Sequence, residues 1–320
     1  MAFNLYGFAW KHAHRVPAPL YRGLLTAVAD MTWLTKTGGV AQLSKNLARV
    51  RPDLSATELS RLTRAGMRSY MRYFGEAFVL TQASPEQITA RVRTANAEPV
   101  LAAIAQGRSP ILALGHQGNW DLAGVWATPH LAPVLTVAER LKPDEVFQEF
   151  LAYRNKLGMR ILAAGDPGVF RDLLRAAGKP GSLIALLGDR DLSRSGIEVD
   201  LFGHRARVAA GPAALAVGSG APLFGLGIYY ERLTGERRKA AGSPWGIVMD
   251  FSPEIQVDRT LPKEDQVAAT TQAWVDQVAV HLARHPQDWH MLQKVFIADL
   301  DPARYAASIA STESRTDGAA

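Results

Sequence analysis

The chain has 320 residues, of which 48% are hydrophobic and 21% are charged, with a formal net charge of +6 and no cysteine. This length and apolar fraction suit one large or two small globular domains and exclude an intrinsically disordered chain. The absence of cysteine excludes a disulfide scaffold, a cysteine-ligated zinc or iron–sulfur site and a cysteine nucleophile.

The positive charge is concentrated near the N-terminus. Residues 1–75 carry eleven Lys or Arg and three Asp or Glu, a net charge of +8, so the rest of the chain carries −2. A basic segment on a nearly neutral body predicts contact with an anionic surface from one side. Nucleic-acid binding is disfavoured, because the body is slightly acidic and holds no recognised nucleic-acid-binding motif.

The first thirty residues mix bulky apolar and basic side chains around Pro17 and Pro19, which predict two short helices. Neither helix holds the roughly 20 apolar residues that a membrane span requires. The pattern fits helices that lie at the interface of an anionic membrane, and equally helices that pack on the protein body. A secretory signal peptide is not expected, because the apolar residues precede the basic ones.

Two further helices are expected over residues 40–51 and 55–80. In the second, apolar residues recur at helical spacing and a series of arginines is interleaved with them. These arginines are Arg61, Arg64, Arg68 and Arg72. By itself such a series is typical of a solvated helix face.

From about residue 99 short apolar runs alternate with helical patterns. The expected strands are 111–114, 134–138, 159–162, 182–187, 197–202, 222–230 and 246–251. The expected helices are 99–106, 118–128, 143–157, 166–178, 211–218 and 263–284. This alternation predicts an α/β fold with a central mixed, mainly parallel β-sheet flanked by helices and preceded by N-terminal amphipathic helices.

The domain organisation is expected to be simple. We predict a single domain over residues 1–306, in which residues 1–80 form a basic, membrane-facing part. The composition of residues 307–320 predicts a disordered tail. No transmembrane segment is expected, since the longest uncharged stretch, over 208–230, contains seven Gly or Pro residues.

The strongest local signal is the segment 111–121, which reads Ile-Leu-Ala-Leu-Gly-His-Gln-Gly-Asn-Trp-Asp. An apolar strand ends there in a Gly-rich turn that presents His116, and a helix follows; open α/β sheets place active sites at this end of a strand. His116 can act as a general base near neutral pH, and Asp121 can hold its tautomer. A histidine that only caps the helix is the alternative, because this spacing alone is a weak signal.

Motifs of other chemistries are missing from the sequence. It contains no Gly-x-Ser-x-Gly elbow, no Walker loop, no Gly-x-Gly-x-x-Gly and no His-Glu-x-x-His. His281 and His285 are spaced like two metal ligands, but no acid stands in register between them, so no metal is expected. With no nucleophile beside it, His116 would deprotonate a substrate hydroxyl that attacks an acyl donor directly, and the turn 115–118 would offer backbone N–H groups to the oxyanion.

The His-x4-Asp motif in this strand–turn–helix setting resembles that of the glycerolipid and lipid A acyltransferases. Further blocks in the same order strengthen the resemblance, among them Val-Ala-Glu-Arg-Leu-Lys-Pro at 137–143 and Asp-Trp-His-Met-Leu-Gln at 288–293. The others are 118–126, 153–154, 189–196, 199–203 and 210–212. Over about residues 5–305 the chain is similar to the lipid A (lauroyl/myristoyl) acyltransferase family, and within it to members that acylate phosphatidylinositol mannosides.

The resemblance implies a peripheral enzyme at the cytoplasmic face of the cell membrane, bound to an anionic surface and needing no cofactor. It would move a long acyl chain from acyl-CoA, the co-substrate, to the mannose 6-hydroxyl of a phosphatidylinositol mannoside. His116 would be the base, and a carboxylate of the block 188–191 would complete its relay. The family usually has Glu where this chain has Asp189, so both Asp189 and Asp121 are kept as the orienting carboxylate. The implied substrate-binding residues are Glu139, Arg140, Arg154, Arg190 and His290.

Two alternatives stay open. One is a lipid A-type acyltransferase that takes its acyl chain from acyl-carrier protein. The other is a non-catalytic peripheral membrane protein that has kept the fold. The presence of His116 together with its candidate carboxylates favours an enzyme.

Overall fold

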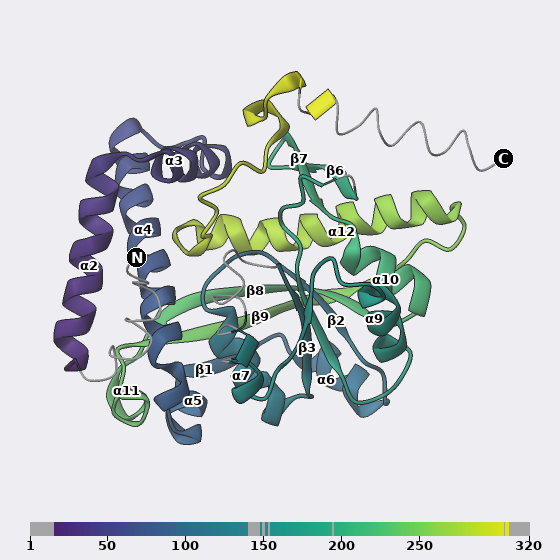
Figure 1. Ribbon diagram of the computed structural model, residues 1–320, viewed down its shortest axis with the longest axis horizontal. Helices are drawn as coiled ribbons and strands as arrows, with labels where there is room; N and C mark the ends of the chain where they lie inside the picture. The colour runs from purple at the N-terminus through teal and green to yellow at the C-terminus, as the bar shows by residue number, and fades with distance from the viewer. Residues whose placement is uncertain are drawn as a thin grey trace.

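The computed structural model describes residues 16–139, 148, 151–152, 154–193, 195–303 and 305–306. The predicted α/β fold is confirmed: a seven-stranded sheet has the order β1-β9-β8-β2-β5-β3-β4 (Figure 1). In this sheet β8 and β9 pair antiparallel and the other neighbours pair parallel. Its strands are β1 (Val92–Ala95), β2 (Ile111–Leu114), β3 (Val134–Ala138), β4 (Arg160–Ala163), β5 (Leu183–Leu187), β8 (Leu223–Arg232) and β9 (Trp245–Ile255).

Helices cover both faces of this sheet (Figure 1). On one face, one apolar cluster packs beneath α9 (Val169–Ala177), α10 (Gly211–Ser219) and α12 (Lys263–Arg284). On the other, a second cluster packs beneath α5 (Pro85–Arg91), α6 (Glu98–Ala105) and α7 (Trp120–His130). The remaining helices are α2 (Ala18–Thr35), α3 (Gly38–Val50), α4 (Ala56–Val79) and α11 (Gly235–Ala241), with short 3-10 turns η2 (Leu80–Gln82), η3 (Pro286–Asp288) and η4 (Ile297–Asp299).

Several elements differ from the sequence prediction. The run expected at 197–202 is not part of the main sheet: β6 (Gly196–Leu201) pairs with β7 (His204–Ala209) in a separate antiparallel hairpin. The strands β1 and β7 were not expected, because polar residues interrupt their apolar pattern; the short helices α5 and α11 were not expected either. The first N-terminal helix, most of 143–157 and the tail 307–320 lie outside the described residues.

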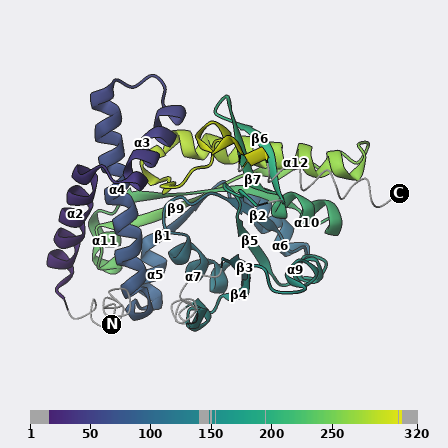
Figure 2. The same cartoon turned by 45° about the horizontal axis from the view of Figure 1, so that its top comes forward.

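The N-terminal helices pack on the protein body at one end of the sheet (Figure 2). The helix α4 begins at a capping box formed by Ser55 and Glu58. Asp30 of α2 accepts hydrogen bonds from Arg64 and Arg68 of α4, at 2.5–2.9 Å. The packing alternative is therefore confirmed for α2. No helix in the described part of the chain is long and apolar enough to cross a membrane.

Candidate active site

The order of the strands brings His116 beside Asp189. β2 and β5 are parallel neighbours whose last residues, Leu114 and Leu187, are paired in register. Each strand is followed by one glycine and then by one of the two polar residues. Parallel neighbours in register end side by side, so both side chains reach the carboxyl edge of the sheet, where open α/β sheets hold their sites.

Asp189 is buried and accepts three hydrogen bonds. Its Oδ1 lies 2.6 Å from Nδ1 of His116, and its Oδ2 accepts the backbone N–H of His116 at 2.9 Å and the indole N–H of Trp289 at 2.8 Å. A carboxylate only accepts, so Nδ1 carries the proton. The Nε2 lone pair is therefore the basic position of His116, whose side chain is 37% exposed.

The charges around His116 raise its pKa. Burial by itself lowers the pKa of the imidazole, but the charge and hydrogen bond of Asp189 outweigh it; Arg190 opposes the rise and Glu139 adds to it. Burial likewise raises the pKa of Asp189, yet the imidazole and the three hydrogen bonds hold that pKa below its usual value. The site thus pairs an ionised carboxylate with a base that is stabilised in its protonated form.

The chain after α12 returns to hold the turn that carries His116. The N–H of His290 donates to the carbonyl of His116 at 2.7 Å, and the N–H of Gly118 donates to the carbonyl of Asp288 at 2.9 Å. Gly118 has φ of +65°, and a Cβ at this position would overlap the carbonyl oxygen of Ile228. Only glycine therefore fits the turn at this point.

The turn does not offer the oxyanion donors that the sequence predicted. The N–H of His116 is bound to Asp189, that of Gly118 to Asp288, and that of Gln117 to the carbonyl two residues before it. These three donors are already engaged in holding the turn. The prediction is wrong for them because the local glycine pattern does not reveal which distant acceptors the folded chain supplies.

Gly118→Ala is expected to lower the free energy of unfolding by about 2–5 kcal/mol, because the left-handed backbone costs ~1–2 kcal/mol and overpacking a further ~1–3 kcal/mol. Gly203 is a matched control, with φ of +75° and no atom within 4 Å of a built Cβ. Gly203→Ala should therefore show the backbone cost alone. Urea unfolding of both variants measures the difference, and equal losses would contradict a steric role for Ile228.

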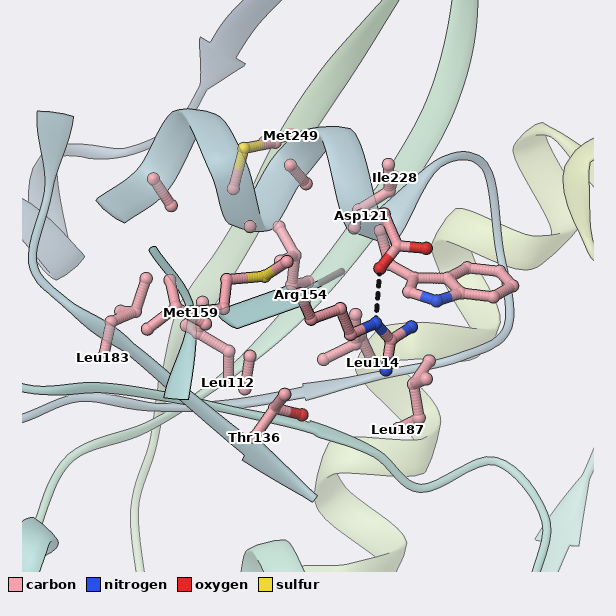
Figure 3. A pocket seen from close by; sticks show the side chains of 17 residues that line it. Leu112, Leu114, Asp121, Thr136, Arg154, Met159, Leu183, Leu187, Ile228 and Met249 are labelled. Atoms are coloured by element: carbon pink, nitrogen blue, oxygen red, sulfur yellow. Dashed lines mark hydrogen bonds and ion pairs between the residues drawn. The ribbon is translucent and has the colours of Figure 1, made fainter. Parts of the chain in front are cut away.

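Asp121 is bound to other partners than His116. Its Oδ1 accepts from Nε of Arg154 at 2.7 Å (Figure 3). Its Oδ2 accepts from the hydroxyl of Tyr73 at 2.9 Å. Both members of the ion pair are buried. Of the two carboxylates that the sequence left open, the one that contacts the His116 ring is Asp189.

An apolar cavity lies next to this ion pair, between α7 and the sheet (Figure 3). Its volume is about 50 Å³. The labelled lining residues in Figure 3 are Leu112, Leu114, Asp121, Thr136, Arg154, Met159, Leu183, Leu187, Ile228 and Met249. Because Leu114 and Leu187 end the two strands that carry the catalytic candidates, the cavity begins directly beneath them.

His290 is a buried, neutral imidazole. The Ser69 hydroxyl donates to Asp288 at 2.6 Å, so its oxygen accepts the N–H of His290 Nε2 at 3.0 Å. Nδ1 is then an acceptor, without a hydrogen-bond partner among the described residues. Burial, with the nearby positive charge of Arg72, lowers the pKa of His290 to about 3. This side chain can accept a hydrogen bond but cannot serve as an acid or base near neutral pH.

The other predicted substrate-binding residues are Glu139, Arg190 and Arg140. Glu139 directly follows β3 and is exposed. Arg190 directly follows Asp189, and its Nε donates to the carbonyl of Lys294 at 3.0 Å. Both are near enough to influence the pKa of His116. Arg140 lies outside the described residues.

The family profile described as "Bacterial lipid A biosynthesis acyltransferase" matches residues 1–297. A "Phosphatidylinositol mannoside acyltransferase" of Mycolicibacterium smegmatis is 37% identical over 303 residues, covering 94% of this chain and 93% of that protein. A protein of the same name from Mycobacterium tuberculosis is 35% identical over 305 residues, covering 94% and 90%. The chain belongs to the lipid A acyltransferase family. It is an acyltransferase.

Some contacts of this lipid A acyltransferase family member were not anticipated from its sequence. Ser69 and Tyr73 lie four residues apart on α4 and reach His290 and Asp121. Trp289 holds Asp189. The four-residue spacing of Ser69 and Tyr73 and the Asp-Trp-His block were visible in the sequence. From these segments, however, we interpreted only the interleaved arginines of α4 and the histidine of the block.

Metal chemistry has no candidate among the described residues of this acyltransferase: no group of three or more His, Cys, Asp or Glu side chains is placed to hold an ion there. His281 and His285, the two histidines spaced like metal ligands, contact neighbouring side chains instead. His281 lies 2.9 Å from the hydroxyl of Ser252, and His285 stacks on Tyr229 with ring centroids 3.6 Å apart.

Proposed function

We propose that this acyltransferase moves a long acyl chain from acyl-CoA to a mannose hydroxyl, the 6-hydroxyl, of a phosphatidylinositol mannoside, with no cofactor. The observation that carries the mechanism is the partly exposed His116, whose Nδ1–H is held by the buried Asp189. The acceptor is supported by the two relatives at 35–37% identity, whose names give that substrate.

The proposed reaction is a direct transfer. Nε2 of His116 takes the proton of the mannose hydroxyl while that oxygen attacks the thioester carbonyl. The tetrahedral oxyanion collapses by breaking the carbon–sulfur bond, and the coenzyme A thiolate leaves and takes the proton from the imidazolium. Asp189 stabilises the imidazolium in between, as the carboxylate of a catalytic triad does. No acyl-enzyme forms.

We assign the acyl chain to the apolar cavity beneath the strand ends. The volume of about 50 Å³ holds only part of a long chain, so we infer that the lining rearranges on binding. Met159 and Met249 lie in this lining, and methionine side chains adapt readily to a new occupant. Burying each methylene would contribute about 0.8 kcal/mol.

For the acceptor sugar, His290 offers the acceptor Nδ1 described above, and Glu139 and Arg190 flank His116. We propose that these three residues bind the substrate, together with Arg154 beside the cavity. Arg140 is included only because of the resemblance to the family. We also infer that residues 1–306 work as one domain.

We place the enzyme peripherally at the cytoplasmic face of the cell membrane. One side of α2 exposes large apolar residues at helical spacing, while its other side packs on α4. Leu20, Leu24, Met31 and Leu34 are each 58–66% exposed. An apolar helix stripe next to a basic segment suits the interface of an anionic membrane.

The double variant Leu20→Asp and Leu24→Asp is expected to weaken binding to vesicles that contain anionic phospholipid by at least about tenfold, because each leucine buried in the interface is worth about 1.5–3 kcal/mol. Leu101→Asp on α6, where the leucine is 46% exposed, is the control and should bind like the parent. Cosedimentation measures both. Unchanged binding of the double variant would show that this side of α2 does not face the membrane.

The function itself is tested with purified full-length protein. Palmitoyl-CoA and, separately, a palmitoylated acyl-carrier protein are offered with phosphatidylinositol mannosides or a lipid A precursor, and the products are identified by mass spectrometry. A monoacylated mannoside formed from palmitoyl-CoA supports the proposal. Acylation of the lipid A precursor alone, use of the carrier protein alone, or no transfer at all would overturn it.

A further inference from the structure

A large cavity opens between α2, α4 and the β8–β9 hairpin, away from the apolar cavity beneath His116. Its volume is about 730 Å³, and a second cavity of about 450 Å³ continues along α4. Arg68, Arg72 and Trp245 line both. Figure 2 shows α2 and α4 side by side along this edge of the molecule. We call the two cavities together the arginine groove.

The groove carries an excess of positive charge. Arg61, Arg64, Arg68 and Arg72 follow one another at spacings of three or four residues, so they share one side of α4. Asp30 is the common partner of the middle two. For Arg72 and Arg61 no ion pair is found among the described residues. The four cations therefore stand against two carboxylates, the shared Asp30 and the buried Asp288 that lines the second cavity. The prediction of a solvated face agrees with the exposure of Arg61 and with the 43% and 39% exposure of the Arg64 and Arg68 side chains, and the same series also lines a cavity.

More cations reach the groove from other elements. Arg22 of α2 and Arg232 of β8 line it, again without an ion pair in the described part of the chain. Arg91 also lines it, but its charge is matched by Glu76 at 2.6 Å. Burial and the nearby charges of Arg238 and Arg91 lower the pKa of Arg22. Cations that repel one another in a cavity favour an anionic occupant.

Aromatic rings fix two of these guanidinium groups. The Arg72 guanidinium carbon lies 3.7 Å from the centroid of the Trp245 ring and that of Arg232 lies 4.2 Å from it; Arg72 is also 4.6 Å from the Tyr230 ring. A stacked guanidinium uses its face for the ring and keeps the N–H donors of its plane. Such preorganised donors suit the bidentate recognition of a phosphate oxygen pair.

The position of the groove indicates where the anion comes from. At one end it is lined by Val16, which precedes α2, and by Leu25 of α2, the helix whose outer side carries the exposed apolar stripe. At the other end Ser69 lines it, and Ser69 is hydrogen-bonded to His290 beside the catalytic turn. A ligand in the groove would therefore extend from the membrane-facing helix to the active site.

We propose that the arginine groove binds the phosphodiester of a glycerophospholipid head group, with Arg72 and Arg232 as the principal donors. The identification of this phosphodiester with that of the lipid acceptor rests on the proposed function. Each of the two cavities, at about 730 and 450 Å³, is within the range of sites for small ligands, about 300–1,000 Å³. Binding here would hold the acceptor by its phosphate while its sugar reaches His116.

Isothermal titration of the full-length protein tests this with three probes: dioctanoyl phosphatidylinositol, inorganic phosphate and coenzyme A. Arg72→Gln and Arg232→Gln are each expected to weaken phosphatidylinositol binding at least about tenfold and to change coenzyme A binding less than twofold. Arg171→Gln on α9 removes the same charge from an exposed position and should match the parent. Arg72→Lys should fall in between, because it keeps the charge and loses the planar donor pair.

Unchanged phosphatidylinositol binding in Arg72→Gln and Arg232→Gln overturns the proposal, and so does either of two other results. Loss of coenzyme A binding with phosphatidylinositol binding intact would assign the groove to the acyl donor, and inorganic phosphate that binds as tightly as the lipid would make it a free-phosphate site. If Arg72→Gln unfolds, the exposed Arg232→Gln decides alone. Because binding needs no turnover, a protein that acylates no mannoside but binds the lipid through these arginines would refute only the proposed function.

Discussion

His116→Ala is expected to lower the rate of acyl transfer by about 10²–10⁴-fold, the usual contribution of a general base. The variant should fold normally, because the side chain is 37% exposed and its removal leaves Asp189 with two of its three donors. Single-turnover transfer from radiolabelled palmitoyl-CoA measures the rate, and thermal unfolding checks the fold.

His204→Ala is the matched control, because His204 is an exposed histidine of the β6–β7 hairpin. Its activity should equal that of the parent protein. Vesicle binding should be the same in all three proteins, which separates catalysis from membrane association. A His116→Ala protein that keeps its activity would remove His116 from the mechanism and require another base.

Asp189→Asn is expected to reduce transfer by about 10³–10⁴-fold, because an amide can hold the wrong tautomer of His116 and cannot stabilise the imidazolium. It should also move the pH profile in a defined direction. His116 must be neutral to accept a proton, so activity rises as the pH passes its pKa, which Asp189 raises. Without that carboxylate the pKa of His116 falls, so the acid limb of the kcat/KM profile shifts to lower pH. The maximum of kcat/KM is also much lower.

Asp121→Asn is the control for this shift. It leaves the Arg154 guanidinium buried without its counter-charge, so we expect a loss of about 3–5 kcal/mol of stability. The acid limb should stay in place, because Asp121 makes no contact with the imidazole. If the limb moves in Asp121→Asn and not in Asp189→Asn, the assignment of the two carboxylates is reversed.

Much of the fold could be predicted from local patterns. Apolar runs of four to nine residues, bounded by turn-forming residues such as Gly and Pro, predicted seven of the nine described strands, because a buried strand needs continuous apolar side chains. β1 and β7 were missed because arginines interrupt them, and the partner of β6 was missed because hairpin pairing depends on a strand that the pattern did not show. The helix α4 begins within one residue of the predicted start at residue 55, since Ser55 caps its first turn.

The arginine groove could not be predicted from a local sequence pattern. A charged series on an amphipathic helix has the same pattern whether it faces solvent or lines a cavity. Which of the two holds depends on α2 and Trp245, which come from parts of the chain before and long after α4. The same applies to Ser69 and Tyr73, whose partners lie on distant segments.

His116 itself was determined by the sequence, because a four-residue apolar strand followed by a Gly-rich turn and a capped helix can only present that side chain at the strand end. The identity of its partner was decided by the tertiary structure. Asp121 is five residues away along the chain and Asp189 is 73 away, yet the strand order sets β5 beside β2 and in register with it. Strand order follows from how helices of the whole chain cover the sheet, which no local pattern encodes.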